Sequence, residues 1–109
     1  MTIPMQPQMG QPTPVLLLLN MVTREELFNE ADYADIFEDT ESEAKKFGVI
    51  ERVVIPRDGP GVGRVFIHYR SAPEAMQAFR ALNGRKFSNR TVEARYYDER
   101  LFQSGDFGR

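Results

Sequence analysis

Acidic side chains are concentrated in one stretch of this sequence. Residues 25–43 contain nine acidic residues and no basic one, which gives this stretch a charge of −9. The rest of the chain carries 14 basic and 7 acidic residues, or +7, so the formal net charge of −2 hides a strong asymmetry. A long acidic segment on a basic body attracts positive charge to one side of a molecule. This charge asymmetry indicates a binding partner.

Three of these acids lie at helical spacing. Asp35, Asp39 and Glu43 are four residues apart and would line one side of a helix, where like charges cost about 0.2–0.5 kcal/mol per pair. A cationic peptide would supply the missing opposite charges and would associate faster at low salt. The alternative is an ordinary solvated face, which explains solubility but not the lack of basic residues over nineteen positions.

Cysteine and histidine usage excludes most catalytic and metal-binding chemistry. The chain has no cysteine and one histidine, His68, so it offers no thiolate ligand, no cysteine nucleophile and no histidine cluster. We therefore predict no enzyme activity, no cofactor and no metal. His68 lies in a strand pattern and is more typical of a sheet surface than of a catalytic base. The longest apolar run, Val15 to Leu19, is too short to span a membrane, so we expect a soluble intracellular protein.

The apolar pattern predicts six elements that must position these residues. Alternating or continuous apolar runs indicate strands, and apolar residues three or four apart indicate helices. In chain order we expect a strand at 15–20, a helix at 30–47, strands at 49–55 and 64–69, a helix at 72–82 and a strand at 91–97. This βαββαβ order predicts an α+β, ferredoxin-type sandwich with a four-stranded antiparallel sheet and two helices on one face.

Three residues predict helix ends. Gly48 follows the first helical pattern, where a left-handed cap would end that helix. Ser71 and Glu74 have the spacing of a capping box at the start of the second helix.

The chain divides into three segments. Residues 1–14 hold four of the seven prolines and no charge, so we expect a disordered tail, either a linker from a longer polypeptide or a free N-terminus. Residues 15–97 form the domain. Residues 98–109 form a C-terminal extension whose Leu101, Phe102 and Phe107 can cover an apolar sheet face, so we expect it to fold back over the sheet.

The domain resembles the RNA recognition motif (RRM) family over residues 15–97. Residues 16–21 look like its first-strand signature, and residues 62–69 look like its third-strand octamer. RNA-binding members stack bases on aromatic side chains of these strands. Here Leu17 and Arg64 stand where two of the three aromatics are usual, which leaves Phe66 alone. We expect weak RNA binding, with Arg64 and Phe66 as the residual contacts.

Three further features resemble the U2 auxiliary factor homology motif (UHM), a peptide-binding variant of this family found in that factor's large subunit. They are Leu-Asn-Met-Val at 19–22, the acidic helix ending at 44–48, and the Arg-X-Phe motif within 83–87. The resemblance implies a protein-interaction module of pre-mRNA splicing in the nucleus, acting in 3′ splice site recognition. Its ligand would be a basic peptide with a tryptophan, carried by the branch-point-binding protein or the scaffold subunit of the U2 particle.

The resemblance also assigns residues to a peptide site. Arg85 and Phe87 would enclose the tryptophan ring through cation–π contact and stacking, while Asp35, Asp39 and Glu43 would contact the basic residues. The alternative for Phe87 is a core-capping role, and the alternative function is direct binding of pyrimidine-rich single-stranded RNA. We expect a monomer or a weak dimer.

Overall fold

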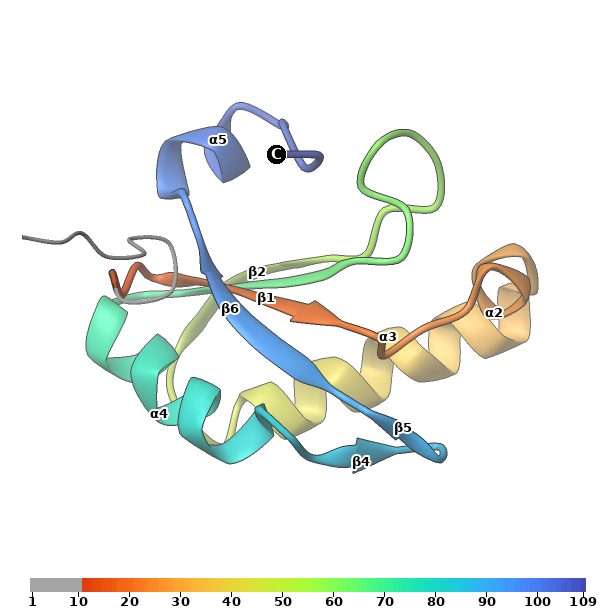
Figure 1. Cartoon of the computed structure of the whole chain (residues 1–109), viewed down its shortest axis with the longest axis horizontal. Helices are drawn as coiled ribbons and strands as arrows, with labels where there is room; N and C mark the ends of the chain where they lie inside the picture. Colours follow the sequence, from red (N-terminus) through yellow and green to blue (C-terminus); the bar gives the residue numbers. More distant parts are fainter. Residues whose placement is uncertain (1–10) are drawn as a thin grey trace, which may run out of the picture.

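The fold is a four-stranded antiparallel sheet with two long helices on one face. The computed structural model describes residues 11–109, and residues 1–10 of the predicted tail lie outside the described residues. The strand order is β2-β3-β1-β6, with α3 and α4 packed side by side below the sheet (Figure 1). The predicted α+β sandwich is confirmed. The elements are β1 (Val15–Leu19), α2 (Arg24–Phe28), α3 (Glu30–Ala44), β2 (Ile50–Val54), β3 (Val65–Tyr69), α4 (Ala72–Leu82), β4 (Lys86–Phe87), β5 (Arg90–Thr91), β6 (Glu93–Tyr97) and α5 (Glu99–Gln103).

Strand β1 lies in the middle of the sheet and separates two apolar clusters. It pairs with β3 on one side and with β6 on the other. Because side chains alternate along a strand, Leu16 and Leu18 face the core between the sheet and α3 and α4, whereas Val15 and Leu17 face the opposite side. A strand that is buried on both faces has to be apolar at every position, which accounts for the continuous run from Val15 to Leu19.

The first long helix ends earlier than its apolar pattern predicts. Helix α3 stops at Ala44, and Lys45 is its C-cap with right-handed backbone angles. The prediction that Gly48 is a left-handed cap is wrong, because its φ is not positive. Glycine is needed there for space: a Cβ at position 48 would lie 2.5 Å from the Cβ of Glu74.

The predicted capping box at Ser71 is also not formed. Ser71 is the N-cap of α4 but makes no capping bond; its hydroxyl instead donates to the carboxylate of Glu74 at 2.8 Å. Glu74 also accepts from the backbone N–H of Val49 at 3.0 Å. These hydrogen bonds lower the pKa of the Glu74 carboxyl, and the bond from Val49 has the largest effect. Glu74 therefore ties the start of α4 to the loop before β2.

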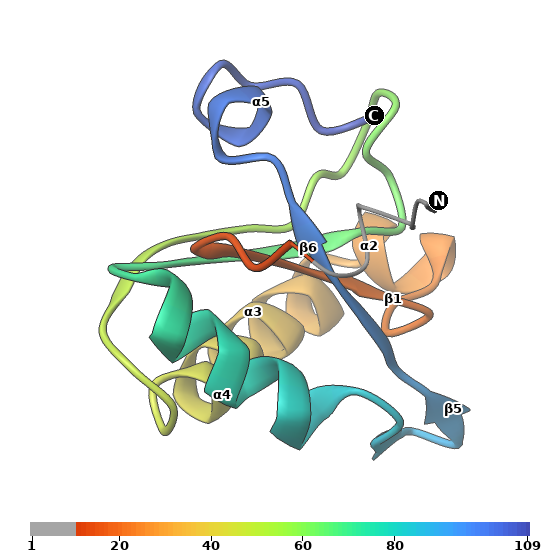
Figure 2. The ribbon, with the colours of Figure 1, turned by 60° about the vertical axis from the view of Figure 1, so that its left-hand side comes forward.

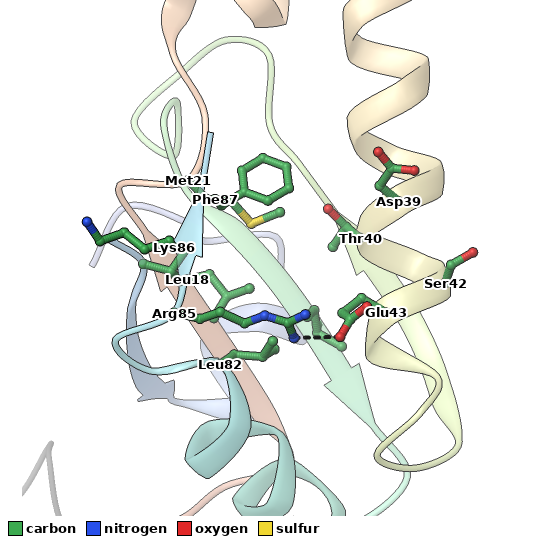
Figure 3. Close-up of a pocket in the computed structure, with 12 residues that line it drawn as sticks. Leu18, Met21, Asp39, Thr40, Ser42, Glu43, Leu82, Arg85, Lys86 and Phe87 are labelled. Carbon is green, nitrogen blue, oxygen red and sulfur yellow. Dashed lines mark hydrogen bonds and ion pairs between the residues drawn. The ribbon is translucent and has the colours of Figure 1, made fainter. Parts of the chain in front are cut away.

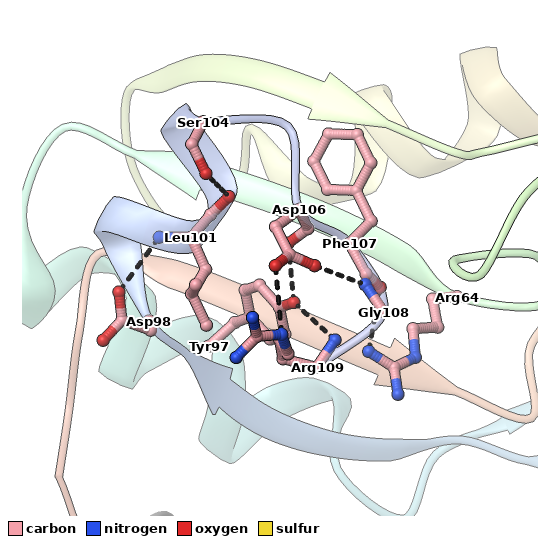
Figure 4. Close-up of polar contacts among 9 residues, drawn as sticks. All are labelled: Arg64, Tyr97, Asp98, Leu101, Ser104, Asp106, Phe107, Gly108 and Arg109. Atoms are coloured by element: carbon pink, nitrogen blue, oxygen red, sulfur yellow. Dashed lines mark hydrogen bonds and ion pairs between the residues drawn. The ribbon is translucent and has the colours of Figure 1, made fainter.

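The C-terminal extension packs on the face of the sheet that α3 and α4 leave open (Figure 2). Phe102 of α5 is 1% exposed, and its ring centroid lies 5.9 Å from that of Phe66. Phe107 approaches the same ring at 5.1 Å. The Tyr97 hydroxyl donates to the carbonyl of Asp106 at 2.7 Å, which holds the chain end against β6 (Figure 4). The extension thus folds back over the sheet as predicted.

Two residues of the predicted tail are bonded to the sheet. The Thr13 hydroxyl donates to the carbonyl of Tyr97, and the carbonyl of Pro14 accepts from the N–H of Tyr69 at 2.8 Å. Thr13 and Pro14 therefore continue the folded domain.

Candidate functional site

A pocket of about 320 Å³ lies between α3 and the chain that follows α4 (Figure 3). The sheet and the end of α4 supply an apolar floor, and α3 and the β4 region supply polar walls. The lining residues are Leu18, Met21, Asp39, Thr40, Ser42, Glu43, Ile67, Leu82, Arg85, Lys86, Phe87 and Val92. Four of the five residues predicted for a peptide site therefore share one cavity.

Helix α3 supplies the acidic wall of the pocket. Asp39 and Glu43 are one turn apart, so both face the cavity on the same side of the helix. Asp35 lies one further turn towards the N-terminus, where it is exposed and outside the pocket lining. Asp35 thus extends the acidic stripe beyond the cavity mouth and does not form part of its wall.

A small hairpin supplies the opposite wall. Strands β4 and β5 pair with each other, joined by Ser88 and Asn89, whose φ angles are 50° and 69°. Positive φ at both central residues is the geometry of a tight hairpin turn, which asparagine tolerates well. The strand predicted at 91–97 starts at Glu93 instead, because Thr91 belongs to β5 of the hairpin.

The hairpin explains the spacing of the Arg-X-Phe motif. Alternate residues of extended chain point to the same side, so Arg85 and Phe87 face the pocket while Lys86 points away from α3 (Figure 3). Arg90 holds the hairpin in place by donating to the carbonyl of Met21 at 2.8 Å and to the carboxylate of Glu26 at 3.2 Å.

An ion pair crosses the pocket. The Arg85 guanidinium donates to the carboxylate of Glu43 at 2.5 Å, and Lys46 donates to its other oxygen at 3.0 Å. These two hydrogen bonds lower the pKa of the Glu43 carboxyl, and the bond from Arg85 has the larger effect. Residues 25–43 contain no basic residue, but some of their acids form ion pairs with basic residues from other parts of the chain. Asp35 and Asp39 have no ion pair among residues 11–109.

The C-terminal extension contacts both residues predicted as residual RNA contacts. Phe66 is fully buried beneath Phe102 and Phe107, and the Arg64 guanidinium donates to the carbonyl of Phe107 at 2.9 Å (Figure 4). His68 lies on the same face, in contact with Phe102 and hydrogen-bonded to Glu99 at 3.1 Å. The sheet surface on which bases stack in RNA-binding RRMs is thus occupied by the extension.

Two general findings concern the described part of the chain. Over residues 11–109, acidic and histidine side chains nowhere gather in threes around a place that could hold a metal ion. Nor does that part of the chain contain a helix with the length and apolar character needed to cross a membrane.

Comparison with known proteins defines the class. Residues 29–93 match the RNA recognition motif family. The solved structure of the RNA15 RRM superposes with a TM-score of 0.58, covering 85% of this chain and 99% of that one at 19% identity, which supports the fold. The chain belongs to the RNA recognition motif family.

Sequence relatives define the type of motif. The large subunit of splicing factor U2af from Nicotiana plumbaginifolia, in its A form, is 43% identical over 101 residues, and its Arabidopsis thaliana counterpart is 41% identical over 102 residues. These alignments cover 87% and 88% of this chain but 18% of each relative. The human serine/threonine-protein kinase Kist is 37% identical over 94 residues, which are 22% of that protein. This short match gives no ground for assigning kinase activity to the chain. The chain is thus an RRM whose sequence relatives include U2AF large subunits, and the resemblance to the large subunit is confirmed.

Proposed function

We propose that this chain is a protein-interaction module of a pre-mRNA splicing factor, and that its pocket receives the tryptophan of a basic peptide. The observation that supports this most directly is the convergence of an apolar floor, the Phe87 ring, the Arg85 cation and two carboxylates on one cavity. At about 320 Å³ the cavity lies at the small end of ligand pockets, which suits one large side chain. Because the relatives are named splicing factors, we expect the partner to be another splicing factor, in the nucleus.

The electrostatics suit a cationic peptide. Asp39 and Asp35 form an acidic path that leads to the pocket and has no ion-pair partner among the described residues. Basic residues next to the tryptophan would lie along this path, and the acidic field would speed their approach. The Arg85 guanidinium, already above the cavity through its bond to Glu43, is placed to cover an inserted ring by a cation–π contact.

Direct binding of pyrimidine-rich RNA is the second candidate, supported by the family match. It would require the extension to leave the sheet, because Phe66 is fully buried and Arg64 is bonded to Phe107. We therefore place it second.

A paired titration tests the proposal. A basic peptide with one tryptophan and an oligouridine are each titrated against the wild type, Arg85→Ala and Lys86→Ala, at low and moderate salt. The two variants remove the same charge from neighbouring positions. Lys86 also borders the cavity, but its side chain points away from α3, whereas the Arg85 guanidinium bonds to Glu43 across it. Loss of a cation–π contact should weaken peptide binding by about twofold to thirtyfold in Arg85→Ala, while Lys86→Ala should change it little.

A second pair of variants tests the acidic wall. Asp39→Lys should weaken peptide binding and flatten its salt dependence, whereas Glu38→Lys makes the same charge change on α3 outside the pocket lining and should have a smaller effect. Binding of RNA without binding of the peptide would overturn the proposal and establish the second candidate.

A further inference from the structure

One polar atom at the wall of the pocket has no partner. Thr40 is 3% exposed and lines the cavity, and its hydroxyl makes no hydrogen bond within residues 11–109. In helices a threonine hydroxyl often donates to the carbonyl four residues earlier, but Thr40 makes no such bond to Ile36. Buried hydroxyls are nearly always satisfied, because an unpaired one destabilises the fold. Thr40 therefore has hydrogen-bonding capacity that the folded chain itself leaves unused.

The side chain is directed towards the cavity. Figure 3 shows Thr40 extending from α3 to the side on which Met21 and Phe87 lie. It stands one residue after Asp39 and one turn from Glu43 along the chain, where the helix turns from its acidic stripe to its buried face. The Thr40 side chain thus lies at the border between the polar wall and the apolar floor of the pocket, with its hydroxyl oxygen buried.

We infer that the Thr40 hydroxyl accepts a hydrogen bond from the indole N–H of the inserted tryptophan, an inference that rests on the proposed function. Indole has one polar group, a donor that cannot accept. Once the ring is inside, that N–H loses water and needs an acceptor, because the floor of Leu18, Ile67, Leu82 and Val92 is apolar.

Thr40 is the best placed acceptor in the pocket lining. Asp39 and Ser42 are exposed, so water competes for their oxygens. Glu43 already accepts from Arg85 and Lys46. Among the described residues that line the pocket, Thr40 alone combines deep burial with an unpaired side-chain acceptor. Thr40 therefore makes the pocket selective for a tryptophan over an aromatic ring of similar size without an N–H.

The test is a double-mutant cycle between the chain and the peptide. Thr40→Val replaces the hydroxyl with a methyl group, and Thr40→Ser retains it. The matched peptide carries 3-benzothienylalanine, in which sulfur replaces the indole N–H. In the wild type and in Thr40→Ser, the tryptophan peptide should bind about threefold to tenfold more tightly than its analogue. In Thr40→Val this preference should disappear, mainly through weaker binding of the tryptophan peptide.

The free chain supplies a second readout. Thr40→Val removes an unsatisfied buried hydroxyl, so it should unfold at the same or a higher temperature than the wild type. Weaker binding would then not result from a damaged fold. Tight binding of the tryptophan peptide with the same preference in Thr40→Val refutes the role of Thr40 and leaves the proposed function intact. A wild type that binds neither peptide refutes both.

Discussion

Replacing Phe102 with alanine is expected to destabilise the chain by about 3 kcal/mol. The ring is 1% exposed and lies within 5.9 Å, centroid to centroid, of Phe66, Phe107 and His68. Buried phenylalanine-to-alanine changes cost about 3–5 kcal/mol. The lower end applies because α5 has five residues and can settle onto the sheet, which reduces the residual cavity. At roughly 4 °C per kcal/mol or more, the melting temperature should fall by about 12 °C or more.

Urea unfolding followed by circular dichroism measures this loss. Phe28→Ala is the matched control: the same atoms are removed, but the Phe28 side chain is 66% exposed, so its cost should stay within about 0.5 kcal/mol. If α5 leaves the sheet without global unfolding, the slope of the unfolding free energy against urea should also fall, because less surface remains to be exposed.

The same variant tests whether the extension blocks RNA. Release of α5 would uncover Phe66, and oligouridine should then bind more tightly to Phe102→Ala than to the wild type. Phe102→Ala with wild-type stability and an unchanged unfolding slope would refute the conclusion that α5 is an integral part of the fold.

Two further predictions concern the contact between α4 and the loop before β2. Gly48→Ala should cost about 1–3 kcal/mol in urea unfolding, because the new Cβ would meet Glu74 at 2.5 Å; unchanged stability would show that Glu74 moves aside freely. The pKa of the Glu74 carboxyl is lowered in the folded chain, so its contribution to stability is full above its ordinary value of 4.5 and is lost as the pH falls through the lower folded value. Glu74→Gln should therefore lose less stability than the wild type as the pH falls below 4.5. The same dependence of stability on pH in both chains would contradict a stabilising role for the ionised Glu74 carboxyl.

The sequence predicted the long elements well and the short ones poorly. The helix at 72–82 has the predicted bounds, since its apolar spacing repeats over three turns. Helices α2 and α5 have five residues each, too few for a period to be visible. A capping box at Thr23 and Glu26 is formed at the start of α2 and was a signal that could have located it. Both errors at Gly48 and Ser71 involve Glu74: its side chain packs against Gly48 and bonds to Val49 across the fold, and the same carboxylate accepts the Ser71 hydroxyl at the start of α4.

The candidate site was predictable in its chemistry but not in its assembly. The charges of Asp39 and Glu43 and the Arg-X-Phe motif are visible in the sequence, and the helix and hairpin spacings place them on common faces. The role of Thr40 was not visible, because its spacing with Ile36 and Ala44 marks only a core-facing position. An unpaired hydroxyl is defined by its surroundings, and these come from β1, α4 and the hairpin as well as from α3.

The sequence by itself determined the order of elements, the buried central strand and the acidic character of one helix, because local periodicity and charge depend on neighbours a few residues apart. The tertiary structure decided which acids line a cavity, which cations neutralise them and which face of the sheet is covered. Arg85 meets Glu43 across 42 positions of the chain, and Phe102 covers Phe66 across 36. Contacts over such separations arise only when the sheet closes, since strand order and helix packing bring these side chains together.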